Sequence, residues 1–455
     1  MADGNRTDIS TELADVLTDL IDGAGVPGIA AGVLVAGETY TAGVGTTSVD
    51  HPQDVDAGTL FQVGSVSKTF TSALVMQLVE DGRIDLDDPV ARHLPALGAA
   101  TGLDTEAITI EHLLSHQAGF DGDHLFTARR ADDLADLADA RRLFEPGTGF
   151  SYSNAAFSIA GAVIEAVTGR GFEDVARTRL LKPLGMRSAG WRADAVITHK
   201  VAMPHVTLGD ETFVLRAGGW QPGWELGPLD RAAGGLIASA DHLLRWSRFQ
   251  LDGLADDGTA LLSVESLERL HAPIVEATPT TRIALDWFVH EVDGATYVAH
   301  GGETPGYLTD LTVAPAAAVG VACTTNALNG GPLCSAVRRW ALERFAGISE
   351  VDPAPDPSVD VDADRLLGRY LHSFGWLDVA AGEDDATLTV EVTPRDVVAW
   401  QPPAQAPITL AASGPFDFVS IDAPGTVRTY RFGLDDHGSP AGWIQSGFRR
   451  APRID

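Results

Sequence analysis

Lysine is nearly absent from this sequence. Among 455 residues only Lys68, Lys182 and Lys200 are lysines, so arginine supplies almost all of the 32 basic side chains. The 63 acidic residues give the chain a formal net charge of −31. Such an acidic surface repels nucleic-acid phosphates and anionic lipid headgroups. We therefore expect neither a nucleic acid nor a membrane as a partner.

Cysteine and long apolar runs are scarce as well. The only cysteines, Cys323 and Cys334, are too few for a disulfide framework in so long a chain and are expected to be buried thiols. No stretch reaches the ~18 consecutive apolar residues of a membrane-spanning helix. The first ten residues, MADGNRTDIS, lack a charged-then-apolar signal pattern. From these absences we expect a cytoplasmic protein.

The length predicts two domains, because a single hydrophobic core rarely organises more than ~300 residues. Residues 351–364 contain three prolines and several aspartates without hydrophobic periodicity, which is typical of a linker. We therefore expect a large domain over residues 1–350, a linker over 351–364 and a small domain over 365–455.

The large domain begins and ends with predicted strands and is helical between them. A first helix is predicted over residues 9–21 and is followed by two Gly-rich strands. Residues 106–190 carry helical patterns, whereas residues 282–326 return to strands. This order predicts an α/β (α+β) fold in which both ends of the domain complete one sheet around a helical insertion. Short alternating runs after residue 365 predict a C-terminal antiparallel sheet or small barrel.

Ser65 and Lys68 lie three residues apart at the start of a helix that is predicted to end at Gly82. This spacing places both side chains on one helix face. A serine hydroxyl is a poor nucleophile until a neighbour takes its proton, and a lysine does so only when its pKa is lowered. The helix N-terminus adds N–H groups that stabilise an oxyanion. An S-x-x-K spacing also arises by chance, so the assignment of Ser65 and Lys68 as a catalytic pair rests on the residues around them as well as on the motif.

Tyr152 and Asn154 follow a Pro/Gly loop and precede another predicted helix. Alternate residues of an extended loop point the same way, so a phenol and an amide can face one site. A phenol beside a lysine can relay protons, and an amide can hold a substrate carbonyl while contacting the lysine. The simpler alternative is that Asn154 caps the helix and Tyr152 packs in the core.

His300, Gly301 and Gly302 lie between a predicted strand and a turn. Two glycines at a strand edge allow a substrate backbone to approach closely. The N–H of Glu303 could then pair with that of Ser65 as an oxyanion hole. A glycine-rich turn with a surface histidine is the simpler alternative.

Six motifs of the sequence occur in this order in a known family. They are FQVGSVSKTF, ITIEHLLSHQAGF, PGTGFSYSNAAFSIAG, LLKPLGM, RAAGGLIASADHLLRW and HGGETPGY. They span about residues 10–345 and strongly resemble the serine β-lactamase-like hydrolases, which include class C β-lactamases, D,D-carboxypeptidases, D-aminopeptidases and family VIII carboxylesterases. The resemblance implies a β-lactamase/transpeptidase-like domain, with a mostly antiparallel sheet flanked by helices and a helical subdomain. The C-terminal segment is similar to a β domain appended in some members.

The resemblance also implies roles for the site residues. Ser65 would be the nucleophile of an acyl-enzyme, with Lys68 and Tyr152 as the general acid/base pair and either one as principal base. The substrate-binding residues would be Asn154, His300, Gly301 and Gly302. We add Glu303 to them because its N–H is expected beside that of Ser65. It implies a small-molecule ester or amide substrate, no cofactor and no metal, and it leaves the oligomeric state open.

One motif departs from the family pattern. Lactamases and transpeptidases usually carry Lys-Thr-Gly where this chain has His300-Gly301-Gly302. A cation that would clamp a substrate carboxylate is thus replaced by a mostly neutral imidazole. This favours carboxylic esters, small amides or D-amino-acid peptides as substrates. D,D-peptidase or β-lactamase activity is an alternative, and so is a catalytically silent relative that binds ligands or assembles.

Other features are weaker. The sequence contains no G-x-S-x-G, which excludes an α/β-hydrolase nucleophile elbow. His112 and His116 lie four residues apart on a predicted helix but not in H-E-x-x-H order, so we expect structural histidines rather than zinc ligands. Loops around Trp220, Trp224 and Trp287 are expected to line the pocket and to decide the substrate.

The net charge of −31 yields a first prediction. We interpret it as adaptation to a molar-salt interior rather than as a device for general solubility, because unscreened repulsion destabilises a compact chain. The melting temperature should rise steeply between ~0.1 M and molar KCl as salt screens this repulsion. Calorimetry across a KCl series measures this, and a flat curve would contradict the interpretation.

Overall fold

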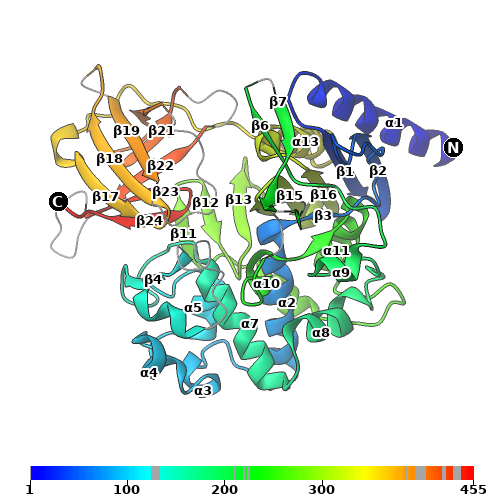
Figure 1. Ribbon diagram of the computed structural model, residues 1–455, viewed down its shortest axis with the longest axis horizontal. Coiled ribbons are helices and arrows are strands. Elements are labelled where there is room, and N and C mark those ends of the chain that lie inside the picture. Colours follow the sequence, from blue (N-terminus) through cyan, green and yellow to red (C-terminus); the bar gives the residue numbers. More distant parts are fainter. Residues whose placement is uncertain are drawn as a thin grey trace.

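The computed structural model contains two eight-stranded antiparallel sheets, the first of them surrounded by helices (Figure 1). It describes residues 2–123, 134–209, 211–218, 221–222, 226–384, 387–394, 406–422, 427–433 and 442–455. Each sheet has its own hydrophobic core.

The first sheet is completed by both ends of the large domain, which confirms the predicted arrangement. Its strands are, in sheet order, β11 (Val275–Thr278), β12 (Thr281–Ile283), β13 (Phe288–Val292), β14 (Ala295–Thr304), β15 (Tyr307–Ala314), β16 (Val319–Thr325), β1 (Gly28–Val35) and β2 (Glu38–Gly45). Every neighbouring pair is antiparallel, and β1 joins β16 in a register that pairs Ile29 with Thr325. The N-terminal hairpin therefore extends a sheet built mainly from the second half of the domain.

Helices cover both faces of this sheet and form the insertion between its parts. They are α1 (Ala2–Ile21), α2 (Ser67–Glu80), α3 (Val90–His93), α4 (Leu97–Thr101), α5 (Ile110–Leu114), α7 (Asn154–Thr168), α8 (Phe172–Ala176), α9 (Ala193–Val196), α10 (Arg231–Gly234), α11 (Ala240–Asp252), α12 (Val264–His271) and α13 (Gly331–Ala341). One core joins α1 and α13 to the sheet through residues such as Leu13, Leu17 and Val337. The larger core joins α2, α7 and α11 to the other face.

Helix α2 lies inside the domain rather than on its surface. All residues from Ser67 to Leu78 are buried, including the polar ones. Buried hydroxyls need hydrogen-bond partners, and these are supplied by neighbouring segments. Trp246 Nε1 donates to Thr69 Oγ1 at 3.0 Å, and Thr71 Oγ1 donates to Ala232 O at 2.7 Å. The helix that follows Ser65 is therefore fixed both by its burial and by hydrogen bonds to neighbouring segments.

Short two-stranded ribbons complete the large domain. They are formed by β3 (Phe61–Gln62) with β10 (Ile237–Ala238), β4 (Phe120–Asp121) with β5 (Arg141–Arg142), β6 (His205–Leu208) with β7 (Glu211–Val214), and β8 (Arg216–Gly218) with β9 (Gln221–Pro222). Within the described residues, no helix combines the length and apolar character needed to cross a bilayer.

The second sheet is an antiparallel meander that closes on itself as a barrel. Its strands are β17 (Gly368–His372), β18 (Gly375–Ala381), β19 (Thr387–Pro394), β20 (Ile408–Ala412), β21 (Asp417–Ser420), β22 (Thr429–Gly433), β23 (Trp443–Ser446) and β24 (Arg449–Pro452). The first and last strands meet where Tyr370 pairs with Arg453 and Ile454 N–H donates to Arg369 O at 2.9 Å. We propose that this barrel is a separate C-terminal domain, with residues 351–364 as its linker.

The barrel is docked on the edge of the first sheet and on the helical insertion (Figure 1). Gln445 Nε2 donates to Ala277 O at 2.8 Å, in the edge strand β11. Ser373 Oγ donates to Asp121 Oδ1 at 2.8 Å, which attaches β4. Arg431 in β22 pairs with Glu276 at 2.9 Å. With the barrel in this position, the red hairpin of β23 and β24 reaches the loop that precedes α7.

Candidate active site

Ser65 lies in a short 3-10 turn (Gly64–Val66) that leads directly into α2. Gly64 has a left-handed backbone with φ of 56°, and a Cβ there would lie 2.6 Å from Glu303 N. Glycine is therefore required for both conformation and space. Ser67 Oγ donates to Gly64 O at 2.6 Å and fixes the turn. Ser65 is partly exposed while the rest of the turn is buried, so a substrate can reach its hydroxyl.

Lys68 stands one helical turn after Ser65 and is completely buried. Its Nζ forms hydrogen bonds with Ser65 Oγ at 3.0 Å and with Ala233 O at 2.5 Å. Burial lowers the pKa of Lys68 to about 7, against the opposing effect of the Asp286 and Asp123 charges. Desolvation favours the neutral amine. Near pH 7 a substantial fraction of Lys68 is therefore neutral, and its lone pair can accept the Ser65 proton.

Tyr152 approaches the same pair from the loop before α7. Lys68 Nζ lies 4.9 Å from the centroid of its ring. Burial, and then the charge of Asp286, raise the pKa of Tyr152 well above its ordinary value, although nearby Ser65 acts in the opposite direction. The Tyr152 hydroxyl is buried without a well-formed hydrogen bond to the described residues. It is thus a protonated phenol beside the serine and the lysine, and the three groups share one site.

Asn154 is held by the carboxylate of Asp123, a residue that no motif of the sequence marks. Ser153, not Asn154, caps α7, because Ser153 Oγ accepts from Ala156 N–H at 3.1 Å. Asp123 is buried, and its Oδ1 accepts from Asn154 N–H at 2.7 Å while its Oδ2 accepts from Asn154 Nδ2 at 3.2 Å. Asp123 therefore orients the Asn154 amide at the site.

The backbone of β14 packs directly on the Ser65 turn. A Cβ at Gly302 would lie 1.9 Å from Val63 O and 3.3 Å from Ser65 N, so only glycine permits this approach. The peptide nitrogens of Ser65 and Glu303 thus belong to two backbone segments in contact. The sequence predicts that both glycines admit a substrate. Gly302 instead admits the Ser65 turn, whereas Gly301 is exposed and a Cβ there would make only an ordinary contact, 3.9 Å from Thr309 O.

A buried carboxylate connects the tyrosine loop to β14. Asp286 Oδ1 lies 3.1 Å from His116 Nε2 and 3.3 Å from His300 Nε2. Burial opposes ionisation of Asp286, but the two histidines outweigh it and lower the pKa of this carboxyl. His116 Nδ1 accepts from Ser153 N–H at 3.1 Å, and the His116 ring lies 4.2 Å from the Tyr152 ring. His300 is only 2% exposed, and its Nε2 faces Asp286 without forming a hydrogen bond to a described residue, so burial separates its side chain from solvent.

The backbone of this connection is strained. His116 has φ of 60° and Asp286 has φ of 74°, both in the left-handed region. For residues other than glycine this conformation costs ~1–3 kcal/mol each and is typical of functional sites. The two strained residues are partners in one buried contact.

The C-terminal barrel supplies one side chain to the site. The turn between β23 and β24 reaches the loop before α7, where Tyr152 N–H donates to Phe448 O at 2.9 Å. The next residue, Arg449, donates from Nε to Asp123 Oδ2 at 3.0 Å. Its guanidinium carbon lies 4.8 Å from the centroid of the Tyr152 ring. A cation from the barrel therefore stands beside the phenol.

Two expectations about other residues need correction. Helix α5 ends at Leu114, so His112 and His116 do not share a helix; His112 Nδ1 accepts from Thr109 N–H, and only His116 reaches the site. Trp287 is fully buried in the core and does not line a pocket. Trp220 and Trp224 lie outside the described residues.

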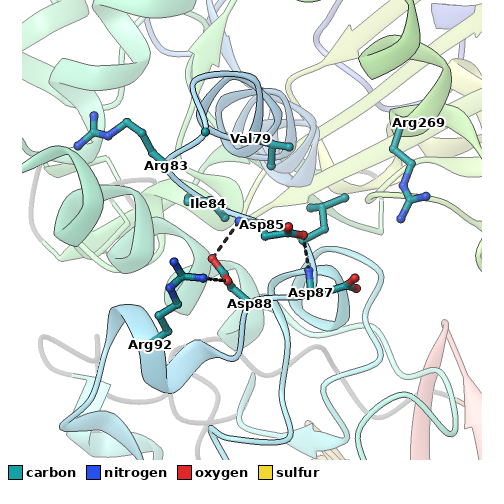
Figure 2. A pocket seen from close by; sticks show the side chains of 10 residues that line it. Val79, Arg83, Ile84, Asp85, Asp87, Asp88, Arg92 and Arg269 are labelled. Carbon is teal, nitrogen blue, oxygen red and sulfur yellow. Dashed lines mark hydrogen bonds and ion pairs between the residues drawn. The ribbon is translucent and has the colours of Figure 1, made fainter.

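A separate pocket of about 390 Å³ lies at the far end of α2 (Figure 2). Its walls include Val79, Asp85, Asp88, Arg92 and Arg269. With 14 residues at ~1.5 Å per residue, α2 separates this pocket from the Ser65 turn. Asp88 is engaged within the pocket, because it pairs with Arg92 and accepts from the backbone N–H of Asp85, as the dashed contacts show. It is not part of the site.

Comparison with known proteins assigns the large domain to a family. The Beta-lactamase family model matches residues 13–344. Penicillin-binding protein 4 of Amycolatopsis lactamdurans is 31% identical over 368 residues, which cover 77% of this chain and 94% of that protein.

Solved structures agree with this assignment. The crystal structure of SurE superposes with a TM-score of 0.76 at 26% identity and covers 99% of this chain and 100% of that one, so the similarity includes the barrel. A D-stereospecific amidohydrolase from Streptomyces sp. superposes with a TM-score of 0.56 at 25% identity, over 69% of this chain and 94% of that one. The chain belongs to the beta-lactamase family of serine hydrolases.

Proposed function

We propose that this protein hydrolyses small carboxylic esters or amides, including D-amino-acid peptides, through an acyl-enzyme on Ser65. The observation that supports this most strongly is the contact of 3.0 Å between Lys68 Nζ and Ser65 Oγ. Because burial lowers the pKa of Lys68 to about 7, the amine can act as a base at neutral pH. Serine is activated in this way when an adjacent group accepts its proton.

Lys68 is the principal base in this mechanism and Tyr152 the proton donor. Ser65 Oγ attacks the substrate carbonyl carbon while its proton passes to Lys68 Nζ. The cationic lysine, 4.9 Å from the Tyr152 ring, then favours loss of the phenol proton. Tyr152 protonates the leaving group as the carbonyl–heteroatom bond breaks, and Lys68 returns a proton to Tyr152. The raised pKa of Tyr152 keeps the phenol protonated at the start of each cycle.

Water completes the reaction with the same groups. It attacks the acyl carbon and gives a proton to Lys68 Nζ, the bond between the acyl carbon and Ser65 Oγ breaks, and Ser65 Oγ takes the proton of Tyr152, which Lys68 then reprotonates. In both steps the negative oxygen of the tetrahedral intermediate would accept hydrogen bonds from the N–H groups of Ser65 and Glu303. The close approach of β14 at Gly302 supports this assignment. A preorganised pair of donors is worth several kcal/mol in such reactions.

The substrate class rests on what surrounds the serine. His300 faces Asp286 at 3.3 Å and so cannot clamp a substrate carboxylate as the usual lysine does. D,D-peptidase or β-lactamase activity is therefore the second candidate. The relative named a D-stereospecific amidohydrolase supports amides of D-amino acids. A catalytically silent binding protein is disfavoured, because such a protein has no need for a buried, neutralised lysine beside a serine.

The nucleophile can be tested by covalent labelling. A fluorophosphonate should add one label to the wild-type protein and none to Ser65→Ala, because only an activated serine attacks phosphorus at a useful rate. Intact mass spectrometry measures the label, and turnover of a nitrophenyl ester in molar KCl measures activity in parallel. Equal labelling of both proteins would exclude Ser65, and labelling without turnover of any ester, D-amino-acid amide or cephalosporin would favour the silent relative.

The pH dependence tests the assignment of the base. Since only neutral Lys68 accepts a proton, kcat/KM should fall as the pH decreases through about 7. It should stay level on the alkaline side to about pH 10, because Tyr152 retains its proton there. The measurement is kcat/KM for a nitrophenyl ester across pH at constant ionic strength.

Substitutions serve as controls for this profile. Lys68→Ala and Tyr152→Phe should each lower turnover at least ~10²-fold, whereas Lys182→Ala, at an exposed lysine, should keep both the rate and the profile. An acid limb near pH 7 that persists in Lys68→Ala would assign the titration to another group.

A further inference from the structure

Arg449 is a cation that the barrel places beside the proposed proton donor. Its guanidinium carbon lies 4.8 Å from the centroid of the Tyr152 ring and 5.2 Å from that of Phe374. The side chain is 17% exposed, so part of it faces solvent. Its position is defined on one side by Asp123, which it meets through Nε at 3.0 Å and Nη2 at 2.9 Å.

Asp123 does not depend on Arg449 alone for its stabilisation. Its Oδ1 also accepts from Asn154 N–H at 2.7 Å and Ala155 N–H at 3.2 Å, at the N-terminus of α7. A helix N-terminus and backbone N–H donors stabilise a carboxylate. The negative charge of Asp123 is therefore shared among several donors. Part of the positive charge of Arg449 remains available to another anion.

The contacts of Arg449 use one edge of its guanidinium. A guanidinium has five N–H donors in a planar fork that matches a carboxylate. Within the described part of the chain, the polar contacts of Arg449 involve Nε and Nη2 and both go to Asp123. Nη1 and the second hydrogen of Nη2 form the other edge of the fork. The N–H groups of this edge have the geometry to donate to a second carboxylate.

The position of Arg449 relative to Tyr152 indicates which part of a substrate it meets. In the proposed mechanism Tyr152 gives its proton to the leaving group, so the leaving group lies next to the phenol. Lys68 Nζ and the Arg449 guanidinium lie at similar distances from the same ring, 4.9 and 4.8 Å. The charge of Arg449 also acts on Lys68 and on Tyr152. Arg449 is thus close to the leaving-group side of the site.

We propose that Arg449 of the C-terminal barrel binds a carboxylate carried by the leaving group, and so takes over the task of the lysine that the His300-Gly301-Gly302 motif lacks. The preferred substrates are then esters or amides whose alcohol, thiol or amine bears a free carboxylate close to the scissile bond, such as an acylated amino acid or hydroxy acid. This inference rests on the proposed acyl-enzyme function and specifies its substrate. It also gives the barrel a role in catalysis.

The inference predicts a preference between two substrates that differ only in one charge. N-acetyl-D-alanyl thioglycolate carries a carboxylate on its leaving thiol, and the matching thioglycolamide does not. Ser65 attacks the thioester carbon while its proton passes to Lys68, the carbon–sulfur bond breaks, and the leaving sulfur takes the proton of Tyr152, which Lys68 then reprotonates. Both substrates form the same acyl-enzyme, so kcat/KM, measured by thiol release, reports recognition of the leaving group. The thioglycolate should be preferred about 10- to 100-fold, as expected for a charge-assisted contact.

Substitutions show whether Arg449 is the source of the preference. Arg449→Gln should bring the ratio of the two kcat/KM values close to one, and Arg449→Lys should keep part of it because the charge remains. Arg450→Gln is the matched control, since the Arg450 guanidinium lies over the Trp443 and Phe144 rings, at 4.0 and 4.7 Å, and not on Asp123. It should keep the wild-type ratio. The ratio is informative even if a substitution lowers both rates.

The outcomes separate this inference from the function on which it rests. A wild-type ratio near one, or a preference that survives in Arg449→Gln, would overturn the role of Arg449 while leaving the acyl-enzyme intact. An equal loss on both substrates in Arg449→Gln would show that Arg449 only holds the domains together. Absence of thiol release from both substrates, with no acyl adduct on Ser65 by mass spectrometry, would overturn the proposed function itself.

Discussion

The site depends on a lysine amine that is kept out of water. Lys68 is completely buried, and its Nζ contacts only Ser65 Oγ and Ala233 O among the hydrogen-bond partners described. Burying an amine costs the folded state free energy, because water no longer solvates the charge. The same cost lowers the pKa of Lys68 to about 7 and makes a base from a side chain that is normally an acid. The central position of α2 provides the burial, since the helix is enclosed on all sides.

Two buried carboxylates then join distant segments around this lysine. Asp286 contacts His116 and His300, and through them it links the tyrosine loop to β14. Asp123 fixes Asn154 and meets Arg449 from the barrel. Each carboxylate lies within reach of Lys68 and opposes the loss of its positive charge. The balance between burial and these charges sets the pKa of the Lys68 amine at about 7. At neutral pH such an amine can both accept and return a proton efficiently.

Local spacing explains what could be predicted from the sequence. The three-residue interval between Ser65 and Lys68 is a property of one helix, and Tyr152 follows a recognisable Pro/Gly loop. The strand and helix patterns likewise predicted the completed sheet and the C-terminal barrel. The partners of these residues are far away along the chain: Asp286 is 170 residues from His116, and Arg449 is 326 residues from Asp123. Such pairs depend on tertiary packing and leave no local signal. The identity of the residue that caps α7 could not be predicted from the sequence either, because serine and asparagine both cap helices well and Ser153 and Asn154 are adjacent.

The scarcity of lysine makes the central claim directly measurable. A protein labelled with ¹³C at lysine Cε should give three resonances, because the chain contains only Lys68, Lys182 and Lys200. The resonance that disappears in Lys68→Arg belongs to the buried amine. The account predicts that it titrates near pH 7. Titration of this resonance near 10.4, the ordinary value for lysine, would contradict the account.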